Sequence, residues 1–141
     1  MCIKRQMLET LPAVGSFVRV SRRRSTFFGR IELHYSPMLA KVDEGSGWST
    51  AAALHDIVDV VLPRPLSELP SLVDEPVDLG SASEGVSLVG MTEKREQANH
   101  FCGGRVERTL TVLANGRLLH WYLSRVDFGP RSGLLRVAIP A

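Results

Sequence analysis

Three adjacent arginines, Arg22, Arg23 and Arg24, form the densest cluster of chemically active side chains in the sequence. They lie between two segments with the alternation of β-strands, so we expect them at the tip between two strands. Adjacent guanidinium groups repel one another, and their forked N–H donors match the oxygens of carboxylates and phosphates. The spacing therefore predicts an anion-binding loop, unless these charges are simply solvated. Further cations that could extend the patch along the outer face of the strands are Arg19, Arg30 and Lys41.

A catalytic arrangement has weaker support. His55 and Asp56, with Asp59, could supply a base and an orienting carboxylate for Ser36 or Ser49 as the nucleophile. Such triads are recognised by geometry, and no nucleophile-elbow sequence surrounds either serine. We therefore expect no enzymatic activity and no catalytic residues, and a small hydrolase-like enzyme is the third of three hypotheses.

A metal site would need three or four ligands at a recognisable spacing. His100 and Cys102 are the only close pair of a histidine and a cysteine, and the other histidines occur singly. A histidine near the end of a helix is explained by its interaction with the helix dipole. We therefore expect neither a metal nor a cofactor.

A second candidate surface lies on a predicted hairpin over residues 106–125. Its centre is Asn115-Gly116, a dipeptide that favours a type I′ turn and sets Leu110 opposite Trp121. Alternation then assigns one face to the core: Leu110, Val112, Leu119, Trp121 and Leu123. The other face carries Leu113 and Leu118 together with a polar-aromatic strip: Thr109, Thr111, His120 and Tyr122. The strip is either a contact surface for a partner or is covered by another part of the chain.

Short strands are also predicted at the start of the chain, over residues 16–21, 28–35, 38–43 and 57–62. Between the last two, Ser49 could cap a short helix, because the three alanines at positions 51–53 favour helix and Leu54, Ile57 and Val61 match its spacing. We therefore expect a short helical stretch or turn that leads into the strand at 57–62.

The order of these segments resembles a known superfold. A VGxxVRV strand, a basic loop, a GRIEL strand, a short third strand and a closing LHDIVDVV segment are similar to the SH3-like small barrels, which include Tudor and KOW modules. The resemblance covers about residues 12–62. It implies a curled five-stranded sheet whose loops bind partners, and it implies no chemistry.

The rest of the chain is expected to hold an acidic connection and a second β-rich unit. Residues 63–85 carry four prolines and five acidic residues, and their Leu and Val side chains predict an extended strap docked across the body. Residues 86–141 should contain a short strand at 86–90, a helix at 92–101 with Thr92 as its N-cap, the hairpin, and a last strand at 133–139. We expect residues 1–62 and 86–141 to pack as one body.

Composition narrows the class of protein. The chain has 141 residues, a net charge of +2 with an acidic middle between basic ends, and two cysteines. It lacks a long apolar run, so we expect a cytoplasmic protein that does not bind membranes. Fourteen arginines against three lysines indicate GC-rich coding, typical of a bacterial or phage protein. We expect it to act as a small accessory factor.

The sequence therefore predicts a mainly β protein, α+β at most, that acts by binding. Another protein is the first expected partner, because mixed charge and an aromatic strip suit a protein interface. Nucleic acid bound through the Arg22–Arg24 loop is the alternative. The pattern does not fix the oligomeric state.

Overall fold

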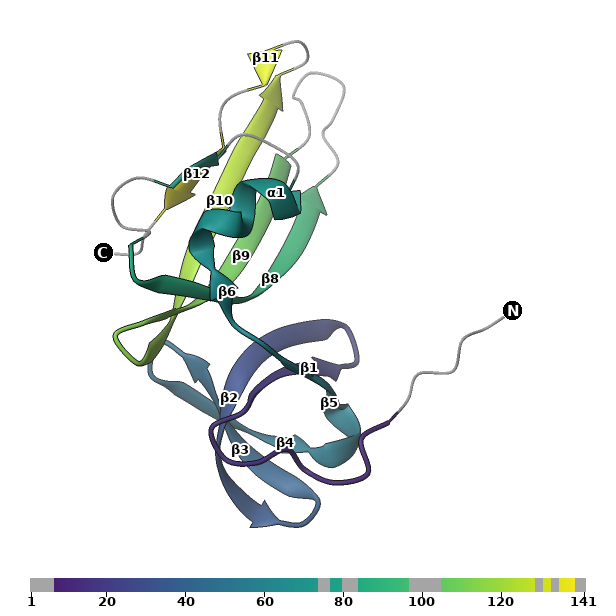
Figure 1. The fold of residues 1–141 in the computed structure, drawn as a ribbon. Helices are drawn as coiled ribbons and strands as arrows, with labels where there is room; N and C mark the ends of the chain where they lie inside the picture. Colours follow the sequence, from purple (N-terminus) through teal and green to yellow (C-terminus); the bar gives the residue numbers. More distant parts are fainter. Residues whose placement is uncertain are drawn as a thin grey trace. The chain divides into compact units, whose positions relative to one another are not determined.

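The computed structural model describes residues 7–73, 77–79, 84–96, 105–128, 131–132 and 135–138. These residues form a mainly β structure with two largely antiparallel sheets (Figure 1), so the predicted fold class is confirmed. The chain divides into two compact units, Met1–Leu62 and Pro63–Ala141. Among the described residues, no helix is long and apolar enough to cross a membrane.

Unit 1 is a five-stranded antiparallel sheet with the strand order β4-β3-β2-β1-β5. Each strand pairs with the next along the chain as far as β4, and β5 returns to pair with β1. The 3-10 turn η1 (Leu54–Asp56) joins β4 to β5. The strands are β1 (Phe17–Arg22), β2 (Ser25–Ser36), β3 (Leu39–Gly45), β4 (Trp48–Ala53) and β5 (Ile57–Val61).

Alternation within these strands builds the core of unit 1. Val18 and Val20 of β1 are fully buried, whereas Arg19 between them is only partly buried. The buried cluster consists of Val18, Val20, Ile31, Ala40, Val42, Ala52 and Ile57. Gly29 makes this packing possible, because a Cβ there would lie 2.4 Å from Val42 Cγ1 and 2.6 Å from the Asp43 carbonyl oxygen.

The helix start expected at Ser49 is wrong, because residues 48–53 form β4. Ser46 and Gly47 have φ of 56° and 82°, which suits a tight turn that returns the chain alongside β3. Ala52 then pairs with Ala40, and both are buried in the core. Tertiary pairing overrides the helix preference of alanine, which is a weak prior. The expected turn and the strand that follows are present as η1 and β5.

Unit 2 is a sheet with the strand order β6-β8-β9-β10-β12-β7, and β11 also pairs with β10. The pairing of β7 with β12 is parallel. The strands are β6 (Arg64–Pro65), β7 (Val77–Asp78), β8 (Val86–Glu96), β9 (Arg105–Ala114), β10 (Arg117–Phe128), β11 (Arg131–Ser132) and β12 (Leu135–Ala138). Between β6 and β7 lie the 3-10 turn η2 (Leu66–Glu68) and the helix α1 (Leu69–Val73).

The hairpin register is as the sequence predicts. Arg117 pairs with Ala114 and Trp121 with Leu110. Asn115 and Gly116 have φ of 52° and 74°, the left-handed values of a type I′ turn. Four of the five predicted core residues of the hairpin are at most 4% exposed, and Leu119 packs against the same cluster.

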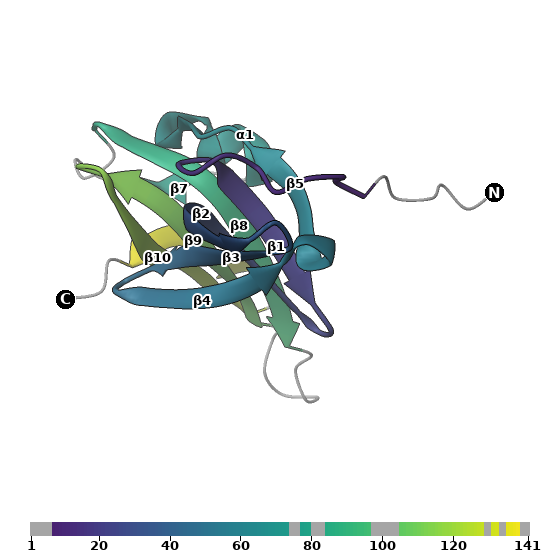
Figure 2. The same ribbon diagram turned by 90° about the horizontal axis from the view of Figure 1, so that it is seen from below.

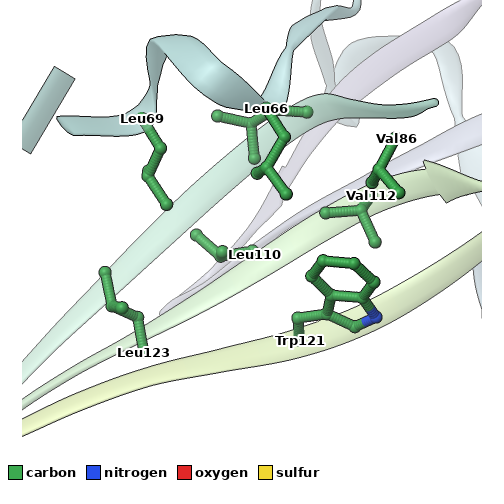
Figure 3. Packing of buried hydrophobic residues seen from close by; sticks show 8 residues of the cluster. Leu66, Leu69, Val86, Leu110, Val112, Trp121 and Leu123 are labelled. Carbon is green, nitrogen blue, oxygen red and sulfur yellow. The ribbon is translucent and has the colours of Figure 1, made fainter. Parts of the chain in front are cut away.

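The acidic, proline-rich segment supplies part of the core of unit 2. Leu66 and Leu69 are 1% and 0% exposed and lie over Leu110, Val112 and Trp121 (Figure 3). The segment was expected to be extended, but it contains the 3-10 turn η2 and the short helix α1. These turns bring Leu66 and Leu69 to the sheet. Whether it also bridges the two units stays a prediction.

The helix expected over residues 92–101 is wrong for its first half, because β8 continues to Glu96. Residues 97–101 lie outside the described residues. In this strand Glu93 faces Arg108 and Lys94 faces Glu107, so opposite charges lie across the ladder. Residues 92–96, TEKRE, carry no apolar side chain with which a helix could pack. Pairing with β9 is therefore favoured over a helix.

Candidate anion-binding loop

The arginine cluster occupies the turn between β1 and β2, as the sequence predicts. Arg22 pairs with Ser25, which leaves Arg23 and Arg24 as the two turn residues. Arg23 has a φ of 46°, in the left-handed region that costs an L-residue about 1–2 kcal/mol. Glycine or asparagine would hold this position with less strain, so the turn displays an arginine at the expense of stability.

Arg22 is integrated into the fold of unit 1. Its Nε lies 3.6 Å from Asp56 Oδ2, and its Nη1 donates to Thr50 Oγ1 at 3.4 Å. Its guanidinium carbon lies 6.0 Å from the centroid of the Phe27 ring. These contacts connect the tip of the β1–β2 hairpin to β4 and to η1. The main role of Arg22 is therefore to stabilise the fold of unit 1.

The cations proposed to extend the patch also have carboxylate partners in unit 1. Arg19 donates two hydrogen bonds to Asp59, at 3.2 and 3.0 Å. Arg30 Nη2 lies 3.8 Å from Asp43 Oδ2, and Lys41 Nζ lies 3.2 Å from Glu32 Oε2. Each pair neutralises its charge locally, which lowers its attraction for an external anion.

Arg23 and Arg24 differ from all of these cations. Both are exposed, and neither makes an ion pair or a hydrogen bond within the described part of the chain. They border an open hollow of about 620 Å³ that is lined by Arg22, Arg23, Arg24, Ser25, His55 and Asp56. The hollow thus presents two unpaired guanidinium groups, which can donate forked hydrogen bonds to a carboxylate or phosphate.

His55 lies on the same hollow, because η1 follows β4 and carries it there. Its Nε2 is 3.4 Å from Asp56 Oδ1, and its side chain is 67% exposed. The sequence showed His55 only as a catalytic candidate, and it did not single out Ser25. The signal that could have placed both residues is the strand expected at 57–62, because its pairing with β1 brings the residues just before it near the first hairpin.

The serines of the hydrolase hypothesis have other partners. Ser49 Oγ donates to Glu32 Oε1 at 3.4 Å, and Ser36 Oγ accepts a hydrogen bond from the Met38 amide at 3.2 Å. Asp59 is held by Arg19. His55 and Asp56, which are adjacent in the sequence, remain in contact, but no hydrogen bond between described residues joins them to Ser36 or Ser49.

The polar-aromatic strip of the hairpin is only partly a surface. Thr109 pairs with Tyr122 and Thr111 with His120, as the register requires. Tyr122 is 46% exposed, whereas Thr111 is 4% exposed and the other two are half-buried. A partner at this face could therefore contact Tyr122, but Thr111 is not accessible as a contact residue.

Arg108 was not singled out from the sequence. Arg108 lies two residues before Leu110 on the core face of β9 and is 5% exposed. Its Nε is 3.5 Å from Glu93 Oε2, and its buried Nε and Nη1 atoms have no hydrogen-bond partner among the described residues. The register with β8 explains the ion pair, because Glu93 stands directly opposite. Alternation from Leu110 could have shown that this arginine points into the core.

Neither a metal centre nor a relative defines the function. Within the described ranges, His, Cys, Asp and Glu side chains form no group of three that could hold a metal ion. His100 and Cys102 lie outside those ranges. Comparisons with protein-family models, curated proteins and solved structures find no match for this chain.

Proposed function

We propose that this protein is a non-enzymatic binding protein whose unit 1 recognises an acidic segment of another protein. Arg23 and Arg24 supply the contacts, by donating hydrogen bonds to carboxylates of the partner. His55 lies on the hollow beside them and can donate a further hydrogen bond. The protein acts as a cytoplasmic accessory or adaptor factor, in keeping with its cysteine usage.

One observation carries this proposal. Among the six cations singled out in unit 1, four are neutralised by carboxylates of the same unit, while Arg23 and Arg24 have no partner among the described residues. A left-handed φ at Arg23 adds weight, because strained backbone that persists is a mark of functional positions.

We also propose that unit 1 is an SH3-like small barrel. The supporting features are the antiparallel order β4-β3-β2-β1-β5, the strongly irregular register of β2 with β3, and the 3-10 turn before the last strand. In that superfold the loops between strands are common binding sites, and the arginine turn is such a loop. This support is an analogy at the level of the fold.

Nucleic acid is the second candidate, and the same two arginines favour it. Two phosphate contacts would give a slope of only about −1.8 for log K against log salt, which is weak for a nucleic-acid-binding protein. Two forked guanidinium contacts can orient the carboxylates of a short acidic protein segment. The charge pattern therefore favours a protein partner.

Capture of partners from the native host tests the proposal. The full chain is immobilised as wild type, as the double variant Arg23→Ser/Arg24→Ser, and as the control Arg117→Ser, which removes an exposed arginine in unit 2. We expect a protein that survives nuclease treatment, binds wild type and the control, and is lost from the double variant. A partner that nuclease releases would assign nucleic acid, and a partner indifferent to both arginines would refute the proposed site.

A further inference from the structure

Strand β4 is an edge of the unit 1 sheet. It pairs with β3 on one side, and no strand among residues 7–62 pairs with its other side (Figure 2). An unpaired edge offers backbone N–H and C=O groups to which another chain can add as a strand.

The register identifies the backbone groups that face outward. In an antiparallel pair, residues alternate between those bonded to the neighbour and those whose groups point away. Leu54 donates its amide to the Met38 carbonyl at 2.9 Å, just beyond the pair formed by Ala53 and Leu39. Ala53 is therefore a non-bonded position. The alternation extends this to Ala51 and Ser49, whose amide and carbonyl groups point to the free edge.

Strand β4 carries neither a charged residue nor a proline. Natural edge strands are blocked by charged residues, especially lysine, or by proline. The sequence of β4 is WSTAAA, without a charge or a proline, and Ser49 and Ala51 are exposed. The opposite edge strand, β5, carries Asp59. Among residues 7–62, the edge strand without a charged residue or a proline is therefore β4.

This edge leads to the arginine hollow. Arg22 donates to Thr50 in the middle of β4, and η1 with His55 begins at the residue after Ala53. The other end of β4 carries Trp48, which is 72% exposed. An extended segment laid along β4 would thus meet an aromatic ring at one end and, at the other end, η1, whose His55 and Asp56 line the hollow.

We propose that the partner's acidic segment binds as an added β-strand along β4, with its carboxylates in the hollow of Arg23 and Arg24. Charge complementarity selects an acidic protein segment as the occupant, because the hollow is cationic and the edge itself is uncharged. The inference rests on the proposed function and adds the mode of recognition. Backbone hydrogen bonds supply affinity and the two arginines supply selectivity.

The test selects ligands from a random peptide display library on the immobilised full chain. Each selected peptide is synthesised, and its binding is followed through the emission of the exposed Trp48, since Trp121 is 4% exposed. The blocking variant is Ala51→Pro, which removes an outward N–H without breaking the ladder to β3. Its matched control is Ala51→Thr, which keeps the N–H. Circular dichroism and Tm establish that both variants fold.

We expect the selected peptides to be enriched in Asp and Glu, with these acidic residues alternating with β-branched residues. Binding should weaken at least tenfold in Ala51→Pro and at least tenfold in Arg23→Ser/Arg24→Ser, and it should be unchanged in Ala51→Thr. N-methylation of alternate backbone amides in the peptide should abolish binding to the wild type.

Other results separate this inference from the proposed function. Loss of binding in the double arginine variant alone would overturn strand addition and leave the arginine loop in place. Loss in Ala51→Pro alone would overturn the arginine loop, and with it the present inference. Selection of non-acidic peptides or of none would also overturn it, and arginine-dependent binding of an oligothymidylate would then assign nucleic acid.

Discussion

Glycine substitutions at the two turn positions of the arginine loop should have opposite effects on stability. Arg23 has a φ of 46°, whereas Arg24 is not among the residues with positive φ. In Arg23→Gly, relief of the left-handed strain stabilises by about 1–2 kcal/mol. The greater freedom of glycine in the unfolded chain offsets roughly 0.5–1 kcal/mol of that gain. We therefore expect a net stabilisation of about 0–1.5 kcal/mol, centred on about 0.8 kcal/mol.

Arg24→Gly is the matched control. It removes the same side chain but relieves no strain, so only the entropic cost remains and we expect a loss of about 0.5–1 kcal/mol. Urea denaturation followed by far-UV circular dichroism measures both values. Equal shifts of the same sign would refute the assignment of strain to Arg23. Binding of the partner should fall in both variants, so stability and binding should change in opposite directions for Arg23→Gly.

Five further substitutions test the packing and the contacts of Arg22. Trp121→Ala should cost about 3–5 kcal/mol because the side chain is 4% exposed, and Tyr122→Ala should cost far less at 46% exposure; similar losses in urea melts would mean that the register has slipped. Gly29→Ala should lower stability by about 1–3 kcal/mol through contact with β3, and an unchanged Tm would contradict that close approach. Arg22→Ser should cost about 1–2 kcal/mol through loss of its contacts with Asp56 and Thr50, whereas Arg24→Ser should stay within about 0.5 kcal/mol; equal values would show that Arg22 is not structural.

Local signals in the sequence predicted the parts of the fold that local chemistry determines. Asn115-Gly116 requires positive φ at both residues, so the turn, the register and the burial of Trp121 all follow from it. Strands with strict alternation, such as β1 around Val18 and Val20, could also be predicted from the sequence. In these cases the pattern of the residues and the tertiary structure require the same conformation.

Errors arose where distant pairing decides the structure. The alanines of β4 favour helix in isolation, and only the ladder with β3 makes them a strand. Thr92–Glu96 likewise belongs to β8 because it pairs with β9. Local propensity carries no information about pairing with a distant strand. The two strands could therefore not be predicted from these segments alone.

The candidate site was predictable in place but not in detail. A basic tip between two strands follows from the position of Arg22–Arg24. Which arginine is paired depends on Asp56 and Thr50, which are far along the chain and come into reach only in the folded sheet. The sequence therefore overestimated the number of cations available to a partner, and it could not separate Arg22 from its neighbours.

Nuclear magnetic resonance titration of the full chain tests the central claim most directly. Polyglutamate and oligothymidylate of similar length are added separately to the isotope-labelled protein. With polyglutamate, we predict that the amide shifts concentrate at Arg23, Arg24, Ser25 and His55 and disappear in the Arg23→Ser/Arg24→Ser variant. Shifts confined to other residues, or an equal response to oligothymidylate, would contradict recognition of an acidic protein segment at this loop.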